Sequence, residues 1–135
     1  MYQTPDKLDL SKINLVTPDA QLYAKTAQGV ADILNSTSKM NKTSQLRRFY
    51  DEFVMWDERL RICSETEKEA KFNEVAPFIQ MIRAKAAYAK GRELVNNDFF
   101  SMIERLLDQV KDTETLHRAK LFFEAVIGFK KAIEK

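Results

Sequence analysis

Glycine and proline are scarce in this chain, with only three of each in 135 residues. Both residues mark turns, so a chain with so few of them has few places at which to reverse direction. Long helices need fewer turns than the strands of a sandwich or barrel, and the sequence shows neither strand-like alternation nor a tandem repeat. The sequence therefore predicts an all-α fold, a compact helical bundle of five or six helices.

The overall composition is that of a folded protein. Hydrophobic residues make up 44% of the chain, with nine Phe, and 135 residues are enough to bury a core. We expect one domain over residues 1–135, with residues 1–16 as an irregular arm whose apolar side chains pin it to the core.

No apolar run is long enough to span a membrane, and the first ten residues contain no apolar signal region. A single cysteine, Cys63, suits a reducing compartment, so we expect a cytoplasmic protein.

Cap signals and apolar periodicity place the helices along the chain. Pro and an acidic residue favour a helix start, Ser and Thr favour caps, and an internal Pro kinks or breaks a helix. The expected elements are a helix from Thr17 to about Leu34, a polar loop over residues 35–41, a helix capped by Thr43 or Ser44, a helix from a capping box at residues 64–67 that Pro77 kinks or breaks, a basic helix from Pro77 to about Gly91, a short helix after residues 96–98, and a last helix capped by Asp112 or Thr113.

Residues 75–92 carry the excess positive charge. They contain Arg83, Lys85, Lys90 and Arg92 and no carboxylate, whereas the whole chain holds 22 basic and 20 acidic residues. On a helix, the four cations border an apolar stripe on both edges, and small residues fill the opposite face. The stripe consists of Val75, Phe78, Ile79, Ile82, Ala86 and Ala89, and the opposite face of Gln80, Ala84, Ala87 and Gly91 with Tyr88 beside them.

That smooth face predicts close approach by a phosphate backbone or by another helix. The alternative is a central helix packed on both sides, with its long cations reaching out to water. Gly91 serves either as a helix C-cap or as a point of close contact. Tyr88 either stacks on a base or packs against a neighbouring helix.

A second group of cations crowds the start of the helix that follows the polar loop. Lys42, Arg47 and Arg48 lie where the helix dipole disfavours positive charge. Free backbone N–H groups together with two guanidinium groups predict a seat for a phosphate. The alternative is two solvated arginines, neutralised by Asp51 and Glu52 one turn further on.

The sequence contains little that is typical of an enzyme. His117 is its only histidine and Cys63 its only cysteine, so no usual zinc site is available, and there is no Gly-rich phosphate loop. We therefore predict no catalytic residue, no metal site and no cofactor. A small hydrolase that uses His117 or Cys63 is the enzymatic alternative.

Three stretches, in order, resemble the small subunit of type III-A CRISPR–Cas effector complexes, the Csm complexes. Residues 42–50 look like the Ser/Thr-x-Leu-Arg helix start of that family, residues 86–92 like its Tyr-x-x-Gly-Arg motif, and residues 116–130 like its terminal Glu-Ala helix. The match covers about residues 42–130, and residues 1–40 add nothing to it. Gly128 departs from the pattern, which usually has a better helix former there, so the straightness of the last helix is in question.

The resemblance implies a non-catalytic subunit in antiviral defence. In that family, several copies stack into a short filament beside the backbone and large subunits of the complex, and guide RNA pairs with target RNA in the channel that they form. Cleavage belongs to other subunits. Cations of the matched motifs and of the basic helix would bind the RNA backbone regardless of sequence, because base pairing supplies specificity.

The candidate residues follow from both arguments. A protein-only helical adaptor or oligomerisation module, whose small-residue face docks a partner helix, is the alternative among binding proteins. The candidate RNA-binding residues are Lys42, Arg47, Arg48, Arg83, Lys85, Lys90, Arg92 and Arg118, and the candidate interface residues are Ala84, Ala87, Tyr88 and Gly91.

Overall fold

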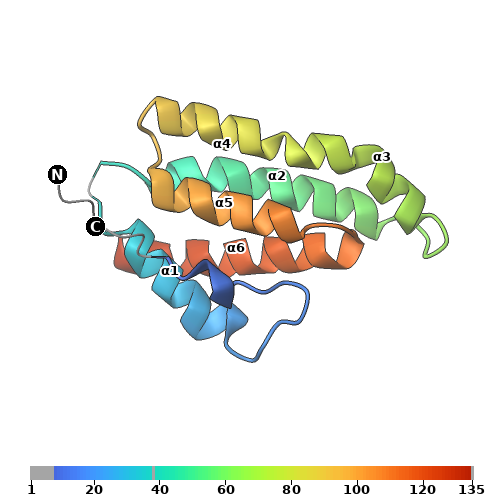
Figure 1. Ribbon diagram of the computed structural model, residues 1–135, viewed down its shortest axis with the longest axis horizontal. Coiled ribbons are helices and arrows are strands. Elements are labelled where there is room, and N and C mark those ends of the chain that lie inside the picture. Colours follow the sequence, from blue (N-terminus) through green and yellow to red (C-terminus); the bar gives the residue numbers. More distant parts are fainter. Residues whose placement is uncertain (1–7, 38, 135) are drawn as a thin grey trace.

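A computed structural model describes residues 8–37 and 39–134, which form a bundle of α-helices (Figure 1). No β-strand occurs in these ranges, and none of their helices is both long and apolar enough to cross a membrane. The all-α prediction is confirmed, and α3 and α4 together form one broken rod. The elements are η1 (Leu10–Lys12), η2 (Leu22–Thr26), α1 (Ala27–Leu34), α2 (Thr43–Arg61), α3 (Lys68–Gln80), α4 (Ile82–Gly91), α5 (Asn97–Gln109) and α6 (Thr113–Ile133).

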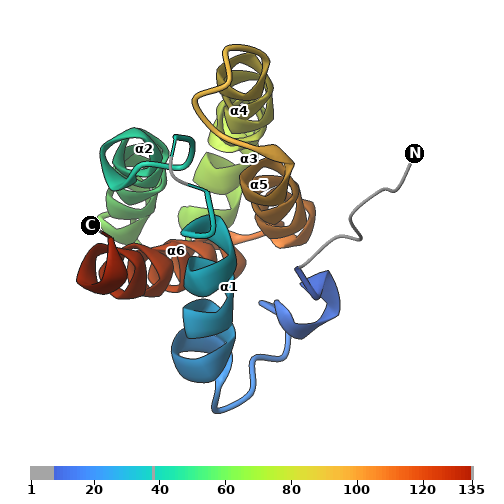
Figure 2. The same cartoon turned by 90° about the vertical axis from the view of Figure 1, so that its left-hand side faces the viewer.

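The longer helices lie side by side in alternating directions (Figure 1). α2 and α5 run one way, whereas the α3–α4 rod and α6 run back, and α1 packs on α6. Consequently the start of α2, the end of α4, the start of α5 and the end of α6 all meet at one end of the bundle, which faces the viewer in Figure 2.

A single apolar cluster fills the space between the helices, with α6 at its centre. Phe123 of α6 lies edge-on to Phe53 of α2, with ring centroids 5.6 Å apart, and 6.0 Å from Phe99 of α5. All three rings are fully buried. The wide apolar stripe expected of the last helix is therefore buried, except for Ile133 in the final turn, which is exposed.

The break between α3 and α4 changes the expected stripe of the basic helix. A break was predicted at Pro77, but α3 continues through Pro77 to Gln80, the rod breaks at Met81, and the basic helix α4 begins at Ile82 rather than at Pro77. Phe78 does not join the buried stripe but is 54% exposed, stacked on Trp56 with centroids 6.1 Å apart. That part of the prediction was wrong for Phe78 alone, because the other five residues of the stripe, Val75, Ile79, Ile82, Ala86 and Ala89, are buried.

The N-terminal arm packs against the bundle as expected, since Leu8, Ile13 and Leu15 are buried, although Val16 is exposed. The predicted helix start at Thr17 is wrong, because the helical segment that leads into α1 begins only at Leu22. Asp19 accepts a hydrogen bond from the N–H of Gln21 (2.9 Å), which stabilises a turn before the helix instead. The part of the arm in residues 1–7 lies outside the described residues.

Two helix caps were predicted correctly and one capping box was not. Asn96 accepts from the N–H of Phe99 (3.2 Å) at the start of α5, and Asp112 accepts from the N–H of Thr115 (2.8 Å) at the start of α6. At residues 64–67, the Ser64 hydroxyl donates to the Glu67 carboxylate (2.9 Å) rather than accepting from the backbone. α3 therefore begins at Lys68 without a side-chain cap.

Candidate nucleic-acid interface

Two asparagines join the segments that carry the cationic motifs. Asn41 is fully buried, and its side chain donates to the carbonyl of Leu34 (3.2 Å) and to Asn96 Oδ1 (2.9 Å). In return, its Oδ1 accepts from the backbone N–H of Asn96 (3.0 Å), and its own N–H donates to the carbonyl of Leu94 (3.0 Å). These bonds hold the start of α2 against the α4–α5 loop, so Lys42 lies at the same end of the bundle as the end of α4.

The end of α4 is closed by a left-handed residue that is not the predicted glycine. The N–H of Leu94 donates to Ala89 O (3.0 Å) and the N–H of Glu93 to Lys90 O (2.9 Å), which is the pattern of a Schellman motif. Glu93 occupies its left-handed position, with a φ of 62°. Gly91 is therefore not the cap but lies inside α4, where an added Cβ would meet no atom within 4 Å.

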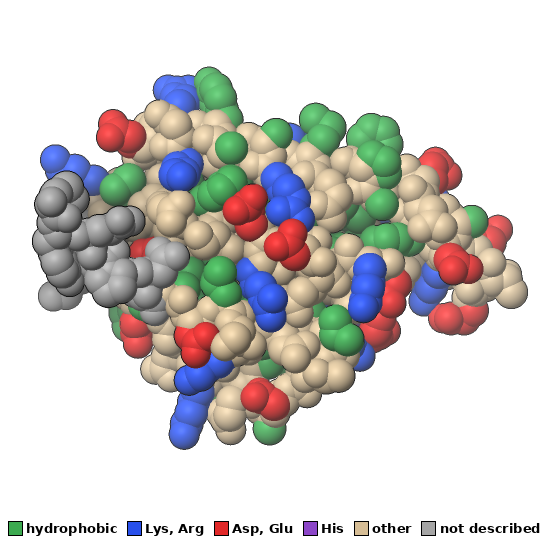
Figure 3. Space-filling view, in the orientation of Figure 1, with side chains coloured by type: hydrophobic (Ala, Val, Ile, Leu, Met, Phe, Trp, Pro, Cys, Tyr) green, Lys and Arg blue, Asp and Glu red, His purple; other side chains and the backbone are tan. Residues whose placement is uncertain are grey.

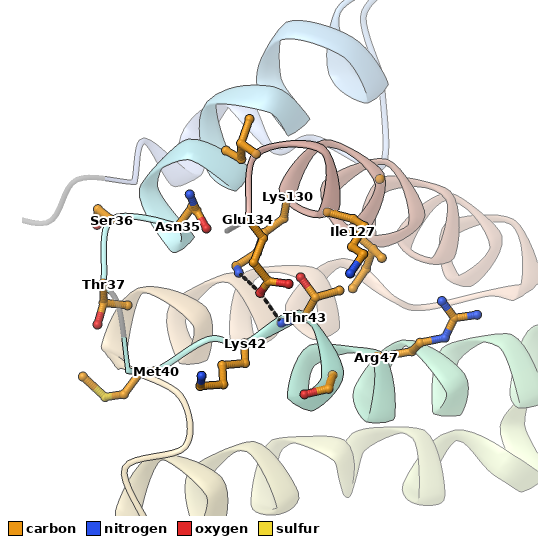
Figure 4. Close-up of a pocket in the computed structure, with 14 residues that line it drawn as sticks. Asn35, Ser36, Thr37, Met40, Lys42, Thr43, Arg47, Ile127, Lys130 and Glu134 are labelled. Atoms are coloured by element: carbon orange, nitrogen blue, oxygen red, sulfur yellow. Dashed lines mark hydrogen bonds and ion pairs between the residues drawn. The ribbon is translucent and has the colours of Figure 1, made fainter.

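A carboxylate from the far end of the chain caps α2. The prediction that Thr43 or Ser44 caps this helix is wrong, since the cap position is Lys42 and its side chain makes no capping bond. Instead, the N–H of Thr43 donates to Glu134 Oε2 (2.9 Å), which also accepts from Lys130 Nζ (3.1 Å) (Figure 4). The Thr43 N–H is the main reason why the pKa of Glu134 falls from 4.5 to about 2, and Lys130 lowers it further. The predicted phosphate seat thus already holds an anion.

A groove of about 870 Å³ surrounds this carboxylate, between the 35–42 loop, the start of α2 and the end of α6. Its lining includes Lys42, Arg47, Lys130 and Lys131 but only one acidic side chain, Glu134. Lys130 is buried, whereas Lys42 and Arg47 extend away from the carboxylate on either side of it (Figure 4). The groove is therefore positively charged.

Three of the eight candidate RNA-binding cations are engaged in contacts that brace the bundle. Arg83 joins α4 to carboxylates of α5, Lys85 joins α4 to α2, and Arg118 holds the N-terminal arm on α6. Their charge is shared with the protein and is correspondingly less available to a ligand. The contacts are Arg83 with Glu104 (3.6 Å) and Asp108, Lys85 with Glu52, and Arg118 with the carbonyls of Leu15 (2.9 Å) and Val16 (3.2 Å).

The other five candidates form no ion pair in residues 8–37 and 39–134, and they come from the first turns of α2 and the end of α4, which lie at the end of the bundle that faces the viewer in Figure 2. The side chains of Lys42, Arg47 and Arg48 make no hydrogen bond or ion pair there, so the alternative, neutralisation of the arginines by Asp51 and Glu52, does not hold in the described residues. The other two cations contact neutral groups. Lys90 donates to Asn97 Oδ1 (3.1 Å) and lies over the ring of Phe100, and Arg92 lies over the ring of Tyr88. We call Lys42, Arg47, Arg48, Lys90 and Arg92 the basic end.

The small-residue face of α4 is open to solvent, as its position opposite the stripe predicted. Ala84, Ala87 and Gly91 are exposed, and Tyr88 is 67% exposed, so the alternative of a helix packed on both sides does not hold within the described chain. Phe78 and Met81 are also exposed and extend this surface along α3, a feature that the sequence stripe had hidden. Figure 3 shows hydrophobic side chains along the outer edge formed by α3 and α4.

The structure also brings together a pair that sequence spacing did not reveal. His117 Nδ1 lies 3.0 Å from Asp57 Oδ1, and Arg61 Nη1 lies 3.2 Å from Nε2 of the same ring. Arg61 Nη1 lies equally far from Nδ1 (3.2 Å), so the guanidinium group covers the side of the ring between its two nitrogens. Cys63 donates to the carbonyl of Arg59 (3.5 Å) instead of pairing with His117. This arrangement gives no support to a hydrolase.

Nowhere in the two described ranges do three His, Cys, Asp or Glu side chains gather closely enough to hold a metal ion. The chemistry that the geometry favours is therefore the binding of anions at the basic end and in the neighbouring groove.

Comparison with known proteins agrees with this picture. Residues 17–135 match the family described as Csm2 Type III-A. Over 115 residues, the chain is 29% identical to a protein of Streptococcus thermophilus described as CRISPR system Cms protein Csm2. This alignment covers 79% of the chain and 87% of that protein. No solved structure gives a significant match. The family match begins well before residue 42, so it is wider than the three motifs on which the resemblance was first based.

Proposed function

The chain belongs to the Csm2 type III-A family, the small subunits of the type III-A Csm effector complex, and we propose that the basic end binds the backbone of guide and target RNA in that complex. Such contacts neutralise phosphates and carry no sequence information, which suits a complex whose specificity comes from base pairing. In this proposal the chain is a non-catalytic, cytoplasmic scaffold and acts as one domain that stacks with other copies of itself.

The observation that carries the proposal is that none of the five cations of the basic end forms an ion pair within the described residues. Its five cations come from α2 and α4, yet the Asn41–Asn96 bonds hold these helix ends together. A surface that keeps five cations without acidic partners within the described chain favours a polyanion. The three bracing cations, Arg83, Lys85 and Arg118, contribute to RNA binding only by holding the fold.

A second surface suits contact with protein. This surface exposes the large side chains of Phe78, Met81 and Tyr88 beside the small residues Ala84 and Ala87. Water solvates such apolar groups poorly, so a contiguous exposed patch of them is typical of a contact surface. We propose that this α3–α4 face packs against a neighbouring subunit of the complex. The proposal keeps part of the adaptor alternative, because protein contact and RNA contact then use neighbouring surfaces of one bundle, which meet where Arg92 lies over Tyr88.

Target-RNA affinity of the assembled complex tests the RNA-binding proposal. An Arg47, Arg48 and Arg92 triple alanine variant should bind target RNA at least tenfold more weakly, by a similar factor for two unrelated guide–target pairs. A matched control replaces Lys12, Lys25 and Lys111, three lysines away from the basic end, with alanine and removes the same charge. Equal weakening by both variants, with both complexes fully assembled, would show that net charge and not the basic end matters.

A further inference from the structure

The start of α2 is built to hold an anion. Lys130 is only 2% exposed, and its ammonium group is paired with the Glu134 carboxylate. A buried ammonium left without an acidic partner is strongly destabilising, so an anion is required here whichever molecule supplies it. The N–H of Thr43, at the positive end of the α2 dipole, adds a second donor to the same oxygen.

A carboxylate does not satisfy every donor at this position. The Thr43 hydroxyl is buried beside Glu134 and helps to lower the pKa of that carboxyl, yet it makes no hydrogen bond of good geometry, whereas Glu134 Oε2 accepts from the Thr43 N–H and from Lys130. In Figure 4 the Thr43 side chain lies at the groove between α2 and α6. A phosphate group offers more acceptor oxygens in a tetrahedral arrangement, so it can bind the N–H, the ammonium and the hydroxyl together.

The surroundings allow this exchange. Glu134 directly follows Ile133, the last residue of α6, so its side chain can leave without moving a helix. The groove around it is much larger than one carboxylate and is bordered by Lys42, Arg47 and Lys131. Glu134 is the one acidic side chain among the residues that line it.

We propose that the start of α2 is a phosphate site that the free chain keeps filled with its own Glu134 carboxylate, and that a phosphate of bound RNA displaces Glu134. Glu134 then acts as an internal competitor, which weakens binding of isolated anions and is overcome when neighbouring phosphates engage the basic end. The choice of RNA as the source of the phosphate rests on the proposed function, whereas the site itself rests on the contacts of Thr43 and Lys130.

Thermal unfolding of the free full-length chain tests the site without the complex. Glu134→Gln removes the competing charge and keeps the side-chain length, so inorganic phosphate should raise the melting temperature of this variant at concentrations at least tenfold lower than for the original chain, compared with chloride at equal ionic strength. Adding Lys130→Met should abolish the response. Glu65→Gln, at an exposed carboxylate near the other end of the bundle, should behave like the original chain.

The outcomes separate the alternatives. A Glu134→Gln variant that responds to phosphate no better than Glu65→Gln makes Glu134 a simple helix cap and overturns the site. If Glu134→Gln does not fold, the Thr43 amide resonance of the original chain is followed in a phosphate titration, and an unmoved resonance overturns the site equally.

A single-stranded RNA with hydroxyl ends distinguishes the two sources of phosphate. It should bind Glu134→Gln at least tenfold more tightly than it binds the original chain. A variant that responds to inorganic phosphate but not to this RNA overturns displacement by RNA. Because these assays use the free chain, they can fail while the basic end still binds RNA in the complex, and the reverse also holds.

Discussion

Replacing Asn41 with alanine should destabilise the bundle severely, because one buried side chain joins the start of α2 to the α4–α5 loop. The substitution removes three hydrogen bonds and leaves the carbonyl of Leu34 and the N–H of Asn96 without their partner. Each unsatisfied buried group costs about 1–3 kcal/mol. Asn41 also has a φ of 61°, a conformation that costs alanine about 1 kcal/mol more than asparagine. We therefore expect a loss of about 3–5 kcal/mol.

Urea unfolding followed by circular dichroism measures this loss. A typical stability is about 5–15 kcal/mol, so the midpoint should fall by more than about 1 M. Asn41→Gly removes the same side-chain bonds without the backbone strain and should lose about 1 kcal/mol less. The control Asn73→Ala changes the same residue type on the exposed face of α3 and should be nearly neutral. A cost below about 1 kcal/mol for Asn41→Ala would refute this account of how the basic end is held together.

Three further changes have defined outcomes. Because the pKa of Glu134 is lowered to about 2 in the folded chain, its carboxylate stabilises the fold fully above about pH 4.5, and this stabilisation is lost as the pH falls towards 2. The difference in melting temperature between the original chain and Glu134→Gln should therefore shrink over that range. A constant difference would contradict the role of Glu134 as a cap. Glu93→Gly relieves a left-handed residue and should raise stability by about 0.4–1 kcal/mol in urea unfolding, whereas a loss would contradict the Schellman assignment. Ala87→Glu should leave the melting temperature of the free chain unchanged but reduce incorporation into the complex at least tenfold, and normal incorporation would mean that the α3–α4 face is solvated.

Local sequence patterns predicted those features that depend on neighbouring residues. The caps Asn96 and Asp112, the break after Pro77 and the buried stripe of α6 all follow from residues within a few positions of each other. Some failures are local, since Asp19 stabilises a turn instead of a helix start and Ser64 bonds to the Glu67 side chain, but others arise from distant contacts. Thr43 was expected to cap α2, but Glu134, 91 residues further along the chain, supplies the carboxylate. No pattern around residue 43 could have indicated it.

The candidate site shows the same division. The sequence revealed where the cations lie but not which of them the fold neutralises. Arg83 meets Asp108 and Lys85 meets Glu52 across helix boundaries, and only the packing of α4 against its neighbours creates these pairs. The convergence of the remaining cations likewise depends on the antiparallel order of the helices, which places the start of α2 and the end of α4 together (Figure 2).

The central claim, that the basic end contacts RNA phosphates, is tested most directly by the salt dependence of target-RNA binding. The slope of log affinity against log salt is measured for assembled complexes with the original chain, the Arg47/Arg48/Arg92 alanine variant and the Lys12/Lys25/Lys111 control. Each lost phosphate contact should reduce the slope by roughly 0.7–0.9 in the first variant, while the control keeps the original slope. An unchanged slope in the Arg47/Arg48/Arg92 variant would contradict phosphate contact at the basic end.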